Sequence, residues 1–233
     1  MRIPSRAFPL LAAIAVAAAS SVQAQAARSD AGSVAEIRDN RFKWFFGAQV
    51  GAMMFETPSQ TQTGVPSLGA HLAIVSRRAG LMIGVDEAFG SGESTGFLDI
   101  NSGGIARSMT FDRLRRYQFS MTGYPVRGSL EPYLGLGFGM LQVINPQFDN
   151  EFFATAEEEA FSAADAHEKS ATGFMSLMAG VQFRVGRMAA FGQYQITSSP
   201  AAGNLLKGPG HSLMGGLRWS LGSSKEGVRG RGY

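Results

Sequence analysis

Few residues in this chain of 233 could do acid–base or nucleophilic chemistry, since it has three histidines and no cysteine. His211 and Ser212 are adjacent, and a histidine base beside a serine is the arrangement that activates a hydroxyl nucleophile. They lie, however, in a stretch that alternates as a β-strand does, so their side chains point to opposite faces. We therefore predict no catalytic residue, and we interpret the pair as the polar start of a strand.

The other two histidines do not have the spacing of a metal site. His71 stands alone, and we expect a hydrogen-bonded interior side chain near Asp86 or Gln49. His167 follows three consecutive glutamates within residues 145–170, and carboxylates with one histidine could hold a divalent cation weakly. Acidic segments are usually solvated, so we expect neither a bound metal nor a cofactor.

Three arginines, Arg113, Arg115 and Arg116, form a basic cluster. Arginine binds phosphate through two parallel hydrogen bonds, and Arg113 and Arg115 fall on the same face of a strand. These two are our candidates for contact with a phosphate group. Pairing with loop carboxylates is the alternative interpretation.

Composition and motifs exclude several classes of protein. No Walker loop, dinucleotide fingerprint or metalloprotease motif is present. The net charge is +3, and several basic residues lie near the two ends of the chain, so we predict no nucleic-acid binding. The lack of cysteine excludes disulfides and thiolate zinc sites. Charged residues make up only 17% and glycines number 30, which is unusual for a soluble domain.

The element that positions the rest is a strand predicted over Glu131–Val143. Large apolar residues alternate there with glycines: Leu134, Gly135, Leu136, Gly137, Phe138, Gly139 and Met140. A period of two indicates a strand, and glycines along one face indicate an interior where backbone and side chains approach closely. The bulky face has no polar counterpart, which favours lipid outside and a small, filled lumen inside.

The run Pro132–Gly139, PYLGLGFG, resembles a strand of the small outer-membrane β-barrels of Gram-negative bacteria, the OmpA/OmpX-like group. The resemblance covers about residues 42–222. It implies insertion by the outer-membrane assembly machinery, and roles such as envelope integrity, adhesion or immune evasion.

Alternation predicts about eight strands along the chain: Lys43–Phe55, Ser67–Ser76, Gly80–Phe89, Arg107–Tyr124, Glu131–Val143, Thr172–Val185, Met188–Thr197 and His211–Leu221. The connections alternate between long and short. The long ones include a Gly/Ser-rich loop over residues 90–104 and the segment 145–170, where we expect a short amphipathic helix or a mobile flap. We therefore predict an all-β fold, an eight-stranded antiparallel transmembrane β-barrel with short periplasmic turns and long external loops.

Polar residues occupy the faces opposite the apolar stripes. We predict a lumenal network of Gln49, His71, Asp86, Arg116, Glu131, Gln182, Arg184, Gln193, Gln195 and Arg218. Acidic and basic members can pair inside a narrow lumen. Trp44, Tyr124 and Trp219 fall at strand ends on the periplasmic side, where we predict an interfacial aromatic belt.

The two ends of the chain read as export and assembly signals. Residues 1–26 have the charged start, apolar run and small-residue cleavage sites of a signal peptide, cleaved after Ala24 or Ala26. We assign 27–41 to a periplasmic lead-in, 42–222 to the barrel and 223–233 to a C-terminal tail. The family's assembly signal on the last strand is matched by Gly216, Trp219 and Leu221, although Met214 occupies its polar position.

We predict a non-enzymatic outer-membrane protein with a structural or surface-interaction role. Its expected partners are outer-membrane lipid, lipopolysaccharide held through phosphate by Arg113 and Arg115, and the assembly machinery. Three alternatives stay open: a membrane-embedded enzyme that modifies lipid A, a narrow pore and a secreted soluble barrel. The sequence does not indicate an oligomeric state.

Overall fold

The structure is a computed structural model that describes residues 41–76, 78–99, 103–149 and 151–225. The signal peptide, the lead-in up to residue 40 and the tail beyond residue 225 lie outside this described part. Their assignments stay predictions.

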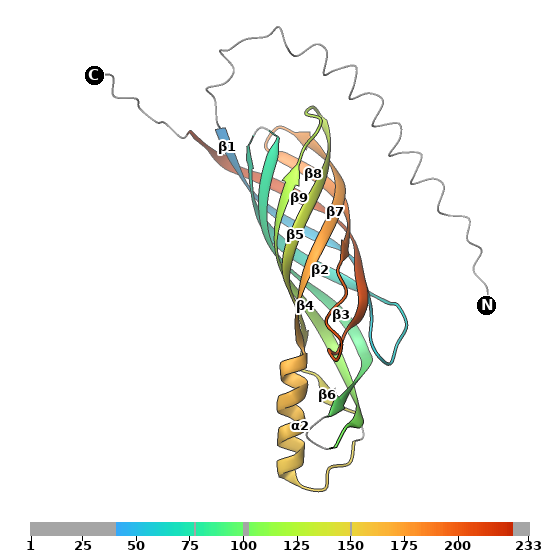
Figure 1. The fold of residues 1–233 in the computed structure, drawn as a ribbon. Coiled ribbons are helices and arrows are strands. Elements are labelled where there is room, and N and C mark those ends of the chain that lie inside the picture. Colours follow the sequence, from blue (N-terminus) through green and yellow to red (C-terminus); the bar gives the residue numbers. More distant parts are fainter. Residues whose placement is uncertain (1–40, 77, 100–102, 150, 226–233) are drawn as a thin grey trace, which may run out of the picture. The chain divides into compact units, whose positions relative to one another are not determined.

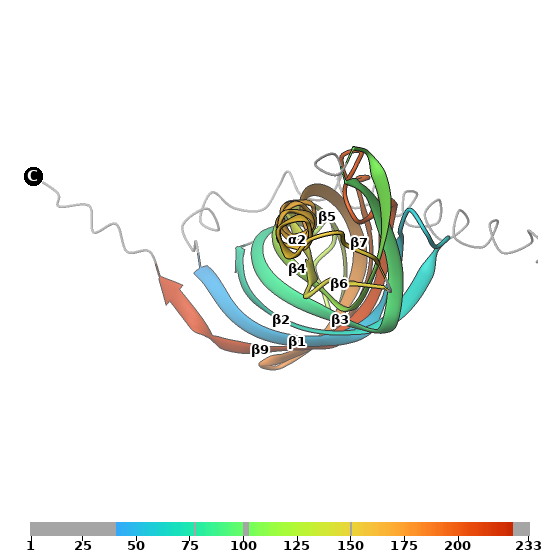
Figure 2. The same ribbon diagram turned by 90° about the horizontal axis from the view of Figure 1, so that it is seen from below.

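Eight long strands form the wall of a barrel: β1 (Arg41–Glu56), β2 (Thr63–Ser76), β3 (Ala79–Asp99), β4 (Ile105–Gly123), β5 (Leu130–Ile144), β7 (Ala171–Val185), β8 (Met188–Thr197) and β9 (Lys207–Lys225). Two further elements, β6 (Gln147–Phe148) and helix α2 (Ala156–Lys169), lie between β5 and β7 in the chain. Every pairing is antiparallel, and the β1–β9 and β3–β4 pairings close the ring. Figure 1 shows the barrel from the side, and Figure 2 shows the strands curving round it. The predicted eight-stranded antiparallel barrel is confirmed.

Residues that alternate along each strand lie on the two sides of the barrel wall, one set facing outward and the other facing the lumen. On β5, Leu134, Leu136 and Phe138 point outward and are 61%, 66% and 60% exposed, whereas Tyr133 points inward and is 1% exposed. Leucine, isoleucine, valine and aromatic side chains form the outward face of the other strands as well. So large an apolar surface belongs against lipid, because water would favour its burial or aggregation.

The longest connections lie at one end of the barrel. The β2–β3, β4–β5 and β7–β8 connections, over residues 77–78, 124–129 and 186–187, lie at the opposite end, which we call the periplasmic end, as in outer-membrane barrels. The other end, which we call the outer end, carries the long β5–β7 connection that contains β6 and α2. The helix expected within residues 145–170 is present, capped at its start by the Thr155 side chain.

The loop predicted over residues 90–104 was wrong, because most of it is strand. β3 continues to Asp99 and pairs with the start of β4, so the two strands project beyond the barrel as one long hairpin. A register shift between Phe89 and Glu93, with Gly92 at a φ of +87°, marks where the hairpin leaves the barrel wall. Strands β2 and β9 also begin earlier than predicted, and β9 runs through Lys225, past residue 222 where we ended the barrel.

Two of the three residues predicted for the aromatic belt have the outward orientation that a belt requires, and the third does not. Trp44 and Trp219 point outward near the periplasmic end and are 42% and 49% exposed. Tyr124 is 3% exposed and lies inside, with its ring centroid 5.6 Å from that of Tyr133. The reason is the alternation itself, since Tyr124 has the same parity as the inward-facing Thr122.

The close packing around the inward glycines can be tested by substitution. A Cβ atom on Gly139 would lie 2.0 Å from the Tyr117 carbonyl oxygen and 2.9 Å from the Phe174 ring. We expect Gly139→Ala to lower the free energy of unfolding by about 1–3 kcal/mol, because backbone must move to make room. Gly192→Ala is the matched control, since its Cβ would meet nothing within 4 Å. Urea titration of the folded band on an unboiled detergent gel measures both variants, and equal midpoints would contradict the packing described.

Candidate functional site

The centre of the lumen holds a polar network. Asp86 accepts hydrogen bonds from Gln49 and from the Nε and Nη2 atoms of Arg116, the latter two at 2.9 and 2.7 Å. Arg116 is 2% exposed and Asp86 is fully buried. The remaining Nη1 of Arg116 donates to the Ser212 hydroxyl at 2.9 Å. A buried charge pair is stable only when its spare hydrogen-bonding groups are satisfied, as these are.

A second network lies nearer the periplasmic end. Glu131 accepts from Gln182, from Arg184 at 2.9 Å and from Arg127 at 3.3 Å. Gln182 in turn accepts from Arg218, at 2.8 Å. Arg127, at the turn between β4 and β5, joins this network although we had not predicted it.

Arg218 differs from the other lumenal arginines because its partners are neutral. It donates to the Nε2 atom of His71 at 2.9 Å, and its guanidinium lies 4.1 Å from the centre of the Phe191 ring. As an acceptor, His71 must be the neutral tautomer that carries its proton on Nδ1. The two other predicted members are also buried: Gln193 accepts from the Tyr133 hydroxyl, and Gln195 donates to Gln118.

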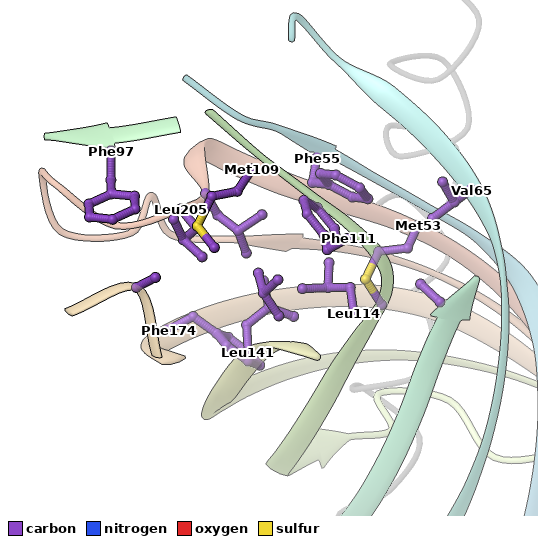
Figure 3. Close-up of a cluster of buried hydrophobic side chains, with 14 residues drawn as sticks. Met53, Phe55, Val65, Phe97, Met109, Phe111, Leu114, Leu141, Phe174 and Leu205 are labelled. Atoms are coloured by element: carbon purple, nitrogen blue, oxygen red, sulfur yellow. The ribbon is translucent and has the colours of Figure 1, made fainter. Parts of the chain in front are cut away.

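Apolar clusters lie toward both ends of the lumen. At the periplasmic end, Phe45, Met82, Tyr133 and neighbouring residues form the smaller cluster. At the outer end a larger cluster fills the mouth, as Figure 3 shows: Met53, Phe55, Val65, Phe97, Met109, Phe111, Leu114, Leu141, Phe174 and Leu205. A lumen filled with side chains at both ends offers no continuous aqueous path, which argues against the narrow-pore alternative.

The outer end also carries a structured head, which we define as the projecting parts of β3 and β4, strand β6, helix α2 and the loop at 198–206. Ser162 and Ala166 are the buried residues of helix α2 within the head. The loop is held to the hairpin by the Thr95 hydroxyl, which donates to the Leu205 carbonyl at 2.5 Å. At the far end of the helix, the Lys169 ammonium donates to the Leu98 carbonyl on β3.

A buried ion-pair cluster fixes helix α2 to the hairpin. Arg107 on β4 is 4% exposed and lies within 3.4 Å of Asp99, 3.5 Å of Glu151 and 2.6 Å of Glu158. Asp99 also accepts a hydrogen bond from the Ser162 hydroxyl of the helix. Burial acts to lower the pKa of Arg107, but its hydrogen bonds and charge pairing with Glu158 and Asp99 outweigh burial and raise it.

The cation site considered at His167 has no support in the geometry. His167 is exposed, Glu158 is committed to Arg107, and Asp165 pairs with Lys169 at 2.6 Å. Among the residues that the structure describes, no group of three or more His, Cys, Asp or Glu side chains is arranged to hold a metal ion. Within the same residues, no helix is both long and apolar enough to cross a membrane.

A groove of about 640 Å³ lies against the hairpin. Its walls are residues 96–98 and 106–108 of the hairpin, residues 58–59 of the β1–β2 connection, and residues 200–204 and 206–208. The lining is mainly apolar, with Lys207 at one side. The sequence predicts neither this groove nor the head, because residues 90–99 are rich in glycine and serine and do not alternate as a strand does.

The two candidate phosphate-binding arginines lie together on the outward face of β4, near the outer end. Arg113 and Arg115 both contact Glu87 of β3, at 3.5 and 3.0 Å, and their side chains are 49% and 32% exposed. The carboxylate that pairs with them is therefore on a strand, not in a loop. One carboxylate shared by two guanidinium groups leaves a net positive charge at this position.

The structure separates His211 from Ser212. His211 points outward, where its Nδ1 atom lies 2.6 Å from the Tyr194 hydroxyl. Ser212 points inward and is 1% exposed. The strand therefore keeps the two side chains on opposite sides of the wall, as the alternation predicts.

The predicted assembly signal lies on β9, the strand that closes the barrel against β1. Trp219 and Leu221 point outward and are 49% and 58% exposed. Gly216 faces the lumen, where a Cβ would lie 2.1 Å from the Ala48 carbonyl oxygen. Met214, at the position that is polar in the signal, is buried in the lumen.

The chain resembles known proteins in structure but not in sequence. No protein-family model matches the chain, and no curated protein is similar to it in sequence. Neisserial surface protein A is 10% identical, with a TM-score of 0.49 over 76% of this chain and 97% of its own. The N-terminal β-barrel domain of Pseudomonas aeruginosa OprF is 8% identical (TM-score 0.37, 75% of this chain and 97% of its own). Ail, the attachment invasion locus protein of Yersinia pestis, is 10% identical (TM-score 0.36, 78% and 99%).

The ion-pair cluster predicts how the head responds to mutation. We expect Arg107→Gln to release helix α2, because Asp99 and Glu158 would lose the cation between them while staying close to each other. The measurement is the rate of limited proteolysis within residues 151–170 of the folded barrel, which we expect to rise several-fold. The unboiled protein should still run as a compact barrel, since Arg107 lies beyond the barrel wall. Arg113→Gln removes an exposed guanidinium on the same strand and is the control; equal cleavage of both variants would argue against the cluster.

Proposed function

We propose that the protein spans the outer membrane of a Gram-negative bacterium and acts there without enzymatic activity, as a surface-interaction protein whose head faces the outside. The observation that carries this proposal is the build of the head. Short connections are enough to close a barrel, but here the β3–β4 hairpin and helix α2 extend beyond it and are joined by the buried Arg107 cluster. A head ordered in this way presents a fixed surface, which favours recognition over simple anchoring.

The filled lumen supports the same proposal. Transport would need an aqueous path, and both ends of the lumen are occupied by apolar side chains. A lipid-modifying enzyme would need a nucleophile and a base facing the same way, and His211 and Ser212 do not. The surface that remains for function is the exterior of the head and of the wall.

Two partners belong to this proposal. Arg113 and Arg115 hold lipopolysaccharide through a phosphate group, because they lie on the lipid side near the outer end with one carboxylate between them. The outer-membrane assembly machinery inserts the barrel, guided by Gly216, Trp219 and Leu221 on the closing strand.

The role of the head is tested by replacing residues 151–169 with a short Gly/Ser linker. We expect this variant to fractionate with the outer membrane and to migrate faster unboiled than boiled, because the barrel strands are untouched. It should lose the surface activity of the full chain, measured as adherence of expressing cells to host-cell layers and as resistance to detergent. Full activity in both assays would argue against the head, and a soluble protein without heat-modifiable migration would overturn the membrane assignment.

The lipopolysaccharide contact is tested by reversing both charges in the double variant R113E/R115E. We expect at least several-fold less lipopolysaccharide to co-purify with the barrel, because the variant places three carboxylates together against the lipid phosphate. Arg78→Glu, an exposed change at the opposite end of the barrel, is the control and should leave co-purification unchanged. Equal lipopolysaccharide and equal barrel yield in all three proteins would remove this part of the proposal.

A further inference from the structure

The periplasmic end contains a small pocket that the proposed function does not use. It has a volume of about 210 Å³ and is lined by residues from three places in the chain: Lys43, Phe45, Arg184, Gly186, Arg187, Ser220 and Gly222. Three of the seven are cations, and no carboxylate lines the pocket. An anion therefore matches it.

The cations of the pocket keep unused hydrogen-bonding capacity. The Nη2 atom of Arg184 donates to Glu131, but its Nε atom is buried and has no partner among the described residues. Arg187 donates from Nη2 to the Ser220 carbonyl at 3.1 Å, which orients its guanidinium beside the pocket. Lys43 is exposed and forms no ion pair within the described part of the chain. A buried donor without an acceptor is costly, and a bound anion would supply the acceptor.

The wider periplasmic end has the same sign of charge. Arg78 and Arg127 lie at the other two turns, and the acid close to these five cations is Glu131, already held by Arg127, Arg184 and Gln182. Counting Lys43, Arg78, Arg127, Arg184 and Arg187 against Glu131 leaves a formal charge of +4. This excess attracts anions toward the pocket.

The position of the pocket indicates which anion reaches it. Trp44 lies next to Lys43 in β1 and Trp219 lies next to Ser220 in β9, and both indoles point outward from the wall beside the pocket. Tryptophan prefers the level of the lipid headgroups, so the pocket lies at the headgroup level of the inner leaflet. The register of β1 and β9 shifts here, and at Gly222 and Gly186 an added Cβ would meet nothing within 4 Å. A headgroup can therefore reach round the strand ends into the pocket.

We propose that this pocket binds the phosphate of an anionic phospholipid of the inner leaflet. Arg187 and Lys43 hold the phosphate oxygens, and the free N–H of Arg184 binds the deepest acceptor of the headgroup. The acyl chains continue along the apolar wall beside Trp44 and Trp219. The barrel is thereby attached to the inner leaflet at one defined position, independently of any lipopolysaccharide contact at its outer end.

The chain carries its own probe for the test, since Trp44 and Trp219 are its only two tryptophans. The folded barrel in neutral detergent is titrated with short-chain phosphatidylglycerol, with phosphatidylcholine of the same chain length, and with inorganic phosphate. Tryptophan fluorescence is followed in each titration. We expect a saturable change with phosphatidylglycerol, a much weaker response to phosphatidylcholine, and only weak competition by inorganic phosphate, because inorganic phosphate lacks the acyl chains.

Two single variants test the pocket itself. Arg187→Gln should weaken phosphatidylglycerol binding about tenfold, the loss expected for a charge-assisted hydrogen bond. Arg78→Gln removes the same charge from another turn of the same end and should weaken binding much less than Arg187→Gln, because it lowers the overall charge excess without removing a contact in the pocket. Lys43→Gln is the second pocket variant if Arg187→Gln fails to show heat-modifiable migration. Equal responses to the two lipids, unchanged binding by the pocket variants, equal loss in Arg78→Gln, or saturation by inorganic phosphate as tight as by lipid would each overturn the proposal.

Discussion

The structure depends on how little room an eight-stranded barrel encloses. The side chains of the inward face must fill the lumen without forcing the wall apart, and three consecutive inward positions on β5 are glycines for this reason. Opposite Gly135 and Gly137 lie Met178 and Ser176, whose side chains would collide with any added Cβ. The narrow lumen also requires that charged side chains pair with one another, because side chains occupy the space that solvating water would need. Asp86 pairs there with Arg116, and Glu131 pairs with Arg184. The spare Nη1 of Arg116 donates to the Ser212 hydroxyl, and Gln182 donates to Glu131.

Because the lumen is filled, the exposed surface of the protein is its exterior, which has an outer end and a periplasmic end. Apolar clusters lie at both ends of the lumen, so the inward side chains pack against one another and the outward side chains form the exposed surface. The two ends of that outside differ in chemistry. The outer end has an ordered head and a pair of arginines that share Glu87. At the periplasmic end, cations outnumber acids among the described residues, and Glu131 pairs with two of these cations.

Local alternation was enough to predict the barrel but not its head. The inward or outward direction of a strand residue follows from its neighbours in sequence, so β8 was predicted with both of its bounds and β5 within one residue at each end. Residues 90–99 are rich in glycine and serine, and they form a strand because they pair with β4 and bury Phe97 in the head. Arg107 meets Glu158 across 51 residues of chain, and no spacing in the sequence signals such a contact. Tyr124 is a case in which alternation gives the right answer, since its parity along the strand places it inward although aromatic residues are common at membrane interfaces.

The long hairpin also has a mechanical consequence. β3 and β4 run from the periplasmic turn region into the head, over 21 and 19 residues. A force that pulls the head away from the membrane is therefore directed along two strands of the barrel wall. The hydrogen bonds between antiparallel strands lie perpendicular to that direction, so the load acts on many of them at once as shear and does not open them one by one. The head is therefore attached to the barrel in a shear geometry, in which the hydrogen bonds of β3 and β4 with their neighbouring strands resist a pulling force together.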